Sequence, residues 1–334
     1  MKELKADLKT GDFKPVYLLH GEEAYLVRHY EAQFAEKLLA GADPMMNQDI
    51  FEGKECDVEA VITAANTLPF FSDWRLVCVR DAQLLTTGRK DATEAMAAYL
   101  PQLPPSTLLL FVETAVDKRN RLYKKIAAQG RAVDCVLPGE AELLRWVANI
   151  FKKKGKQIAP PTARLLLATV PRSMDAIYAE ADKLGDYVGE APHITDEDIH
   201  AVCTPSLEAR IFDLVAALCS RQTERALVQY HTMLAAKEQP LMVLAMMARQ
   251  FRMILQCKAC AQQRISPRDT AAKLGLRDFM VQECLRQAQH FSQQRLLSAL
   301  CDCQDTDTRI KTGLLEGEVG VELLIVQYSQ GDGA

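Results

Sequence analysis

The hydropathy pattern of this chain changes at Pro138 and Gly139, and this change constrains the possible folds more than any other feature. Before it, short β-rich runs alternate with helical patterns. After it, the strand signals stop, and helical patterns separated by caps, glycines and prolines continue to about residue 327. Alternation of strands and helices is typical of βα units on a mostly parallel sheet. The sequence therefore predicts a three-layer α/β region followed by an all-α region.

The predicted strands of the first region are short, and each is bounded by charged or turn residues. They lie at 15–20, 49–52, 75–80, 107–112 and 132–136. In the first helical pattern between them, Leu26, Tyr30, Phe34 and Leu38 recur at intervals of four residues and form one apolar stripe. Such a stripe is expected to cover one face of the sheet.

The all-α region is predicted to hold a small helical domain, a break at 203–206 and a larger helical set. Thr195 begins one helix with a capping-box pattern in which Asp198 replaces the usual Glu or Gln. Further along, Ser266 is expected to cap a helix with Pro267 at its first position. The length of 334 residues agrees with more than one core, since a domain has roughly 150 residues.

Composition and charge exclude several classes of protein. Forty Lys and Arg against 44 Asp and Glu give a net charge of -4, which lacks the basic footprint of a protein that holds nucleic acid alone. The longest apolar run, at 241–248, is shorter than the ~20 residues of a membrane span. Ten cysteines are too few for a disulfide scaffold, and no signal peptide is visible. We therefore expect a soluble cytoplasmic protein with free thiols and no membrane segment.

A working nucleotide site is not expected, although the first region resembles a mononucleotide-binding domain. Gly21 follows the first strand alone, whereas a phosphate loop needs two glycines followed by Lys and Ser or Thr. The Gly-Lys pair at 155–156 lies after a helix and lacks the first glycine of that motif. The third strand ends in Arg80 and Asp81, where a magnesium-binding version would carry two acids.

A metal site and a hydrolase site are not expected either. Cys257 and Cys260 form a C-x-x-C, and Cys301 and Cys303 form a C-x-C, but both pairs fall within helical patterns. A structural zinc site needs ligand pairs on turns. The six histidines have no metal-ligand spacing, and neither G-x-S-x-G nor H-E-x-x-H is present.

Residues 266–289 resemble a helix-turn-helix, and this supports an alternative function as a DNA-binding regulator. The second helix would offer Gln282, Arg286, Gln287 and Gln289 to the bases. The chain is acidic and has little basic footprint around this motif. A helical hairpin within a larger bundle is therefore the favoured interpretation.

An apolar loop is predicted between a helix and the third strand, at 66–73. We use the name apolar loop for its central residues, Leu68, Pro69, Phe70 and Phe71. Pro69 disfavours helix at Leu68 and fixes its own φ, so the turn should be stiff. Two interpretations stay open: the loop packs into the core, or it binds a partner, because exposed apolar clusters usually mark partner sites.

Several short motifs, taken in their order and spacing, resemble those of the delta-subunit family of bacterial DNA polymerase III, a clamp-loader component. The resemblance covers nearly the whole chain, with motifs at 15–23, 67–72, 75–80, 117–119, 180–184, 211–214, 249–252 and 307–313. Ala181 and Asp182 stand where the family more often has Leu and Glu before Lys183, a departure that concerns local packing.

The resemblance implies a degenerate AAA+ (RecA-like) parallel-sheet domain over 1–139, a helical lid domain over 140–206 and a helical collar domain over 207–334. It implies that the isolated chain is not an enzyme and takes no cofactor or metal. It also implies a place in a DNA-directed DNA polymerase assembly, a nucleotidyltransferase that acts in DNA replication.

The resemblance further implies a set of partners. These are the sliding clamp (beta subunit), the gamma/tau and delta prime subunits of a hetero-pentamer, and primer-template DNA within the assembly. By motif, Leu68, Pro69, Phe70 and Phe71 correspond to the family's clamp-binding wedge. The family's delta subunits hold one interface of the clamp ring open while sister subunits hydrolyse ATP. The helix-turn-helix would then be a helix pair of the collar.

Overall fold

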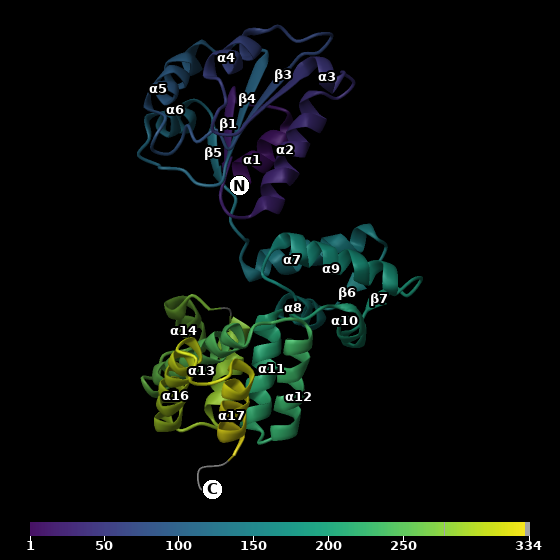
Figure 1. Cartoon of the computed structure of the whole chain (residues 1–334). Coiled ribbons are helices and arrows are strands. Elements are labelled where there is room, and N and C mark those ends of the chain that lie inside the picture. Colours follow the sequence, from purple (N-terminus) through teal and green to yellow (C-terminus); the bar gives the residue numbers. More distant parts are fainter. Residues whose placement is uncertain (277, 331–334) are drawn as a thin grey trace. The chain divides into compact units, whose positions relative to one another are not determined.

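The computed structural model describes residues 1–276 and 278–330. It divides into two compact units: the first comprises Met1–Gly139 and Ser173–Asp175, and the second comprises Glu140–Arg172 and the chain from Ala176 onward (Figure 1). The first long segment thus ends where the hydropathy pattern changes. The further division of the helical unit into a lid and a collar stays a prediction.

Five parallel strands form the sheet of the first unit, in the order β2-β3-β4-β1-β5. Their bounds are β1 Val16–His20, β2 Gln48–Glu52, β3 Arg75–Arg80, β4 Thr107–Glu113 and β5 Arg131–Asp134. All of β1 and nearly all of β3 are buried, as expected for a parallel sheet covered on both faces. The predicted α/β fold is confirmed, and β5 ends two residues earlier than predicted.

Helices cover both faces of this sheet. They are α1 Lys2–Thr10, α2 Ala24–Leu38, α3 Pro44–Asn47, α4 Val58–Asn66, α5 Lys90–Tyr99, η1 Leu100–Gln102 and α6 Arg121–Gln129. Figure 1 shows α4, α5 and α6 on one side of the sheet and α1 and α2 on the other. The predicted stripe of α2 is buried along its whole length, and the ring of Phe34 lies 4.7 Å from that of Tyr17 on β1.

From residue 140 the chain forms α7 Glu140–Lys153, β6 Gln157–Ile158, α8 Pro160–Thr169, α9 Met174–Tyr187, β7 His193–Ile194 and α10 Asp196–Val202. The expectation that strands end at residue 139 is wrong in one respect, because β6 and β7 pair in parallel. Two residues are too few to produce a period-two pattern in the sequence. The predicted capping box is confirmed: the Asp198 amide donates to the Thr195 hydroxyl over 3.2 Å, and the Thr195 amide donates to the Asp198 carboxylate over 2.9 Å.

The remaining helices pack around a central one, α13. They are α11 Leu207–Cys219, α12 Thr223–Ala235, α13 Pro240–Gln262, α14 Pro267–Leu274, α15 Asp278–Ala288, α16 Gln293–Lys311 and α17 Gly317–Ser329. Val243, Met247, Phe251 and Ile254 of α13 are fully buried in the core that these helices share. Within the described part of the chain, no helix is both long enough and apolar enough to cross a membrane.

Candidate functional site

The apolar loop connects α4 to β3 and exposes three large apolar side chains. Leu68 is 76% exposed, Phe70 52% and Phe71 90%, while Pro69 is partly buried. Of the two interpretations left open by the sequence, burial in the core does not hold for these three side chains. Their role in binding a partner stays a prediction.

Rigid elements hold the loop at both ends. At the start of α4, the Glu59 amide donates to the Asp57 carboxylate over 3.0 Å, a standard N-cap. Ala65 in the last turn is fully buried. The Tyr99 hydroxyl donates to Asn66 Oδ1 over 2.7 Å, which ties the end of α4 to α5. The loop therefore leaves a fixed helix and enters a central strand.

The tip of the loop has an unusual backbone. Phe71 has φ of 48°, in the left-handed region, which costs a bulky residue about 1–3 kcal/mol and persists only where the surroundings enforce it. The rings of Phe70 and Phe71 meet edge to face, with centroids 4.6 Å apart. The two aromatic side chains therefore form a paired cluster.

Asn47, the last residue of α3, fastens this tip to that helix. Its fully buried side chain accepts a hydrogen bond from the Phe70 amide over 2.6 Å. Its Nδ2 donates to the Phe70 carbonyl over 2.9 Å and to the Asp43 carbonyl over 3.2 Å. No sequence pattern marks Asn47, because a contact across 23 positions leaves no local signal.

The helix α3 exposes two further apolar side chains, Met45 and Met46. Asp43 caps this helix by accepting the Met45 amide over 2.9 Å. Arg75, the first residue of β3, donates to the Met46 carbonyl over 3.2 Å and pairs with Asp49 over 2.5 Å. The short helix is thus tied to the same strand that the apolar loop enters.

The position that a phosphate loop would occupy is closed by the backbone of the chain. Gly21 has φ of 127°, and a Cβ atom there would lie 2.5 Å from the Cys135 carbonyl oxygen. The Glu23 amide donates to that carbonyl over 2.9 Å. An amide that could face a phosphate is therefore already used, and the glycine serves close packing against the end of β5.

Arg80 and Asp81 follow β3, where a magnesium site would need acids. The Arg80 guanidinium donates to the Glu31 carboxylate of α2 over 2.8 Å. Partial burial acts to lower the pKa of Arg80, but the hydrogen bond and charge of Glu31 outweigh it and raise that pKa. A fixed cation thus stands at this edge of the sheet.

Glu113, at the end of β4, is a buried acid beside this edge. Burial, helped by the nearby charge of Asp81, raises its pKa to about 7, although backbone amides of Ala82, Gln83 and Leu84 act in the opposite direction.

Among the described residues, no group of three or more His, Cys, Asp or Glu side chains could hold a metal ion.

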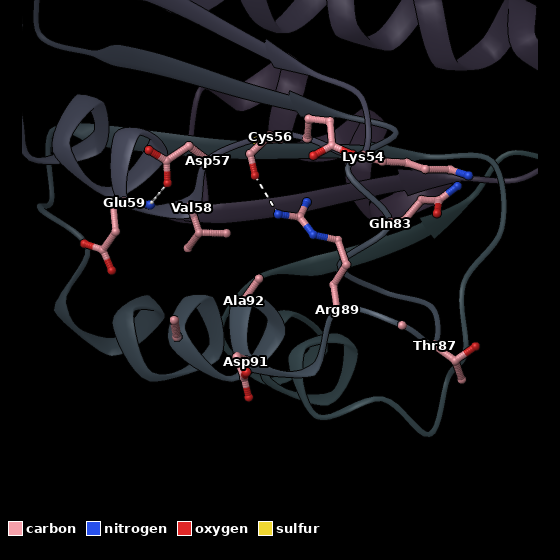
Figure 2. Close-up of a pocket in the computed structure, with 13 residues that line it drawn as sticks. Lys54, Cys56, Asp57, Val58, Glu59, Gln83, Thr87, Arg89, Asp91 and Ala92 are labelled. Carbon is pink, nitrogen blue, oxygen red and sulfur yellow. Dashed lines mark hydrogen bonds between the residues drawn. The ribbon is translucent and has the colours of Figure 1, made fainter.

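A pocket of 740 Å³ lies beside this edge, between the start of α4 and the start of α5 (Figure 2). Arg89 crosses it and donates to the carbonyls of Cys56 and Ala82 over 2.7 and 2.9 Å. Asp57 lines it too, but its carboxylate caps α4. Arg89 thus holds the two loops together, and Asp57 is engaged in capping the helix.

The predicted helix-turn-helix corresponds to α14 and α15, packed within the helical bundle. Gln287, one of the proposed base-reading residues, is buried and accepts a hydrogen bond from Gln250 over 2.8 Å. Arg286 pairs with Glu283 over 2.6 Å. These contacts favour the helical hairpin over a recognition helix.

The four cysteines considered for zinc lie on α13 and α16 as free thiols.

The sheet order and the helical unit define a protein of the AAA+-like fold class. Its sequence matches two family models, "DNA polymerase III, delta subunit" over residues 17–136 and "DNA polymerase III delta subunit, C-terminal domain" over residues 208–328. Together these matches span more than half of the chain. The chain belongs to the DNA polymerase III delta-subunit family.

Similar proteins agree with this assignment over most or nearly all of the chain. DNA polymerase III subunit delta of Bacillus subtilis is 27% identical over 327 residues, 96% of this chain and 94% of that protein. The probable delta subunit of Aquifex aeolicus is 23% identical over 253 residues, 72% of this chain and 71% of that protein. A solved Bacillus subtilis DNA clamp loader delta protein superposes with a TM-score of 0.63 at 26% identity, covering 98% of this chain and 99% of that one.

Proposed function

We propose that this clamp-loader delta subunit binds the sliding clamp through Leu68, Pro69, Phe70 and Phe71 and holds one interface of the ring open. The observation that carries the proposal is the exposure of three large apolar side chains on a loop between fixed elements. A preorganised apolar tip loses little conformational entropy when it enters a pocket. Such a tip suits a partner that offers an apolar cavity.

The proposed assembly contains the gamma/tau and delta prime subunits in a hetero-pentamer in the cytoplasm, and primer-template DNA enters it. This chain itself neither binds nor hydrolyses ATP, and its sister subunits do so. The closed loop at Gly21 and the ion pair of Arg80 with Glu31 support this division of labour. The regulator alternative has weaker support, because Gln287 is buried.

Mixing the purified chain with purified sliding clamp tests the proposal. A complex that elutes ahead of both components in size-exclusion chromatography is expected. A variant in which Leu68, Phe70 and Phe71 are all replaced by Ser should elute separately from the clamp. If the unaltered chain does not form the complex, the proposal is wrong. If the variant binds as well as the unaltered chain, the clamp contacts another part of the surface.

A further inference from the structure

We infer that the clamp-binding surface has a second part, the exposed methionines of α3, and that Asn47 locks this part to the apolar loop. The inference rests on the proposed function, since it concerns the surface that meets the clamp. The inference also goes beyond the proposed function, because it assigns roles to Met45, Met46 and Asn47.

Asn47 holds the backbone at the tip of the apolar loop through hydrogen bonds. Its side-chain amide bonds both the amide and the carbonyl of Phe70, over 2.6 and 2.9 Å, so the backbone at the tip is held from both sides. This pairing sits next to the strained residue Phe71, with φ of 48°. A buried side chain that satisfies both groups can maintain a conformation that the tip would otherwise leave. Asn47 is therefore a positioning residue for the aromatic pair.

Asn47 also links the apolar loop to the exposed methionines of α3. Met45 is 90% exposed and Met46 is 49% exposed, on a helix joined to the loop through Asn47 and to β3 through Arg75. An apolar cluster of this kind on a fixed frame is typical of a partner site. Thioether side chains adapt to irregular apolar surfaces. We expect them to contact an apolar rim of the clamp pocket that receives Phe70.

One single variant, Met45→Ala, tests the methionines against a methionine control elsewhere in the chain. Met45→Ala should weaken clamp binding roughly three- to tenfold, measured by surface plasmon resonance, because a contact at the edge of an interface contributes less than its central anchor. Met242→Ala is the control, since Met242 is also an exposed methionine but lies on α13, outside the proposed surface. Equal affinities for Met45→Ala and the unaltered chain would overturn the second part of the surface.

A double-variant cycle tests Asn47. Asn47→Ala alone should weaken binding about tenfold, but combined with Phe70→Ala its further effect should fall below about threefold, because Asn47 acts through the tip. A purely structural role would instead multiply the two effects in full, so that Asn47→Ala weakens binding equally in the unaltered and the Phe70→Ala backgrounds. If Asn47→Ala does not fold, Asn47→Ser is used in its place. Met45→Ala then still tests whether the methionines belong to the clamp-binding surface.

The outcomes separate the inference from the proposed function. If Phe70→Ala binds the clamp as tightly as the unaltered chain, the proposed function fails. If Phe70→Ala weakens binding while Met45→Ala and Asn47→Ala do not, the inference alone is overturned.

Discussion

At the scale of single residues, exposure decides which apolar side chains serve a partner and which serve the core. Leu26 and Phe34 on α2 are buried and hold the sheet, whereas Phe70 and Phe71 are exposed. The same side-chain chemistry therefore has different consequences for stability and for binding. Substitutions separate the two, because loss of core contacts lowers the free energy of unfolding and loss of surface contacts does not.

Phe70→Ala should weaken clamp binding roughly thirtyfold to several hundredfold, since truncating a central anchor costs about 2 to 4 kcal/mol. Leu68→Ala should cost less. The melting temperature should stay nearly unchanged in both variants, because these side chains lie outside the core. Calorimetric titration and thermal unfolding on one preparation measure both quantities. A strong loss of melting temperature with normal clamp binding would show that the loop serves the core.

Glu113→Gln should change how stability depends on pH. Burial raises the pKa of Glu113 to about 7 from its ordinary value of 4.5, so the folded state holds the proton more tightly than the unfolded state. Stability from this group is therefore full below about pH 4.5 and is lost as pH rises through 7, by on the order of 3 kcal/mol. Urea unfolding at pH 5 and pH 8 should show a smaller difference for Glu113→Gln. Parallel behaviour of both proteins would contradict the assignment.

At the scale of elements, the loops after the strands decide what chemistry the sheet can perform. The turn from β1 to α2 packs against Cys135, and the end of β3 is fixed by the pair of Arg80 with Glu31. Phosphate binding needs several free amides at such a turn and a carboxylate for magnesium. These elements have the backbone arrangement of a nucleotide-binding fold, but other residues stand where the phosphate-binding and magnesium-binding groups would be.

The isolated chain should therefore show no binding of ATP with magnesium at micromolar concentration. Titration calorimetry checks this, with a protein that has an intact phosphate loop as a positive control. Saturable heat from the isolated chain at micromolar ATP would contradict the prediction.

At the scale of the whole molecule, the helical unit presents apolar surface that its own core does not use. The helix α17 buries Val321, Leu324 and Ile325, yet Val319 and Leu323 on the same helix are exposed. Val319 and Leu323 lie four positions apart and form an exposed apolar stripe, and such stripes often mark partner sites. We expect sister subunits of the proposed pentamer to cover this stripe.

Leu323→Glu should impair assembly with the other clamp-loader subunits while leaving the melting temperature and binary clamp binding unchanged. A charge on an exposed position does not disturb the core, but burying it in an interface without a partner is costly. Native mass spectrometry of the mixed subunits measures assembly, with Glu318→Gln on the same helix as the control. Normal assembly by Leu323→Glu would exclude α17 from the interface.

The sequence by itself determined the local features of this protein. The stripe of α2, the capping box of Thr195 and Asp198, and the helix start at Ser266 all follow from spacing within a few residues, and all are confirmed. The strand positions follow from short apolar runs in the same way. Local geometry is fixed by neighbouring residues, so local patterns predict it.

Only the tertiary structure decided which groups meet. The exposure of the apolar loop, the burial of Glu113 and the contact of Asn47 with Phe70 depend on elements far apart in the chain. The pairing of β6 with β7 likewise joins two segments too short to leave a pattern. Burial and hydrogen bonding between distant residues are set by packing, which no local periodicity encodes, and the candidate site therefore emerged in full only from the fold.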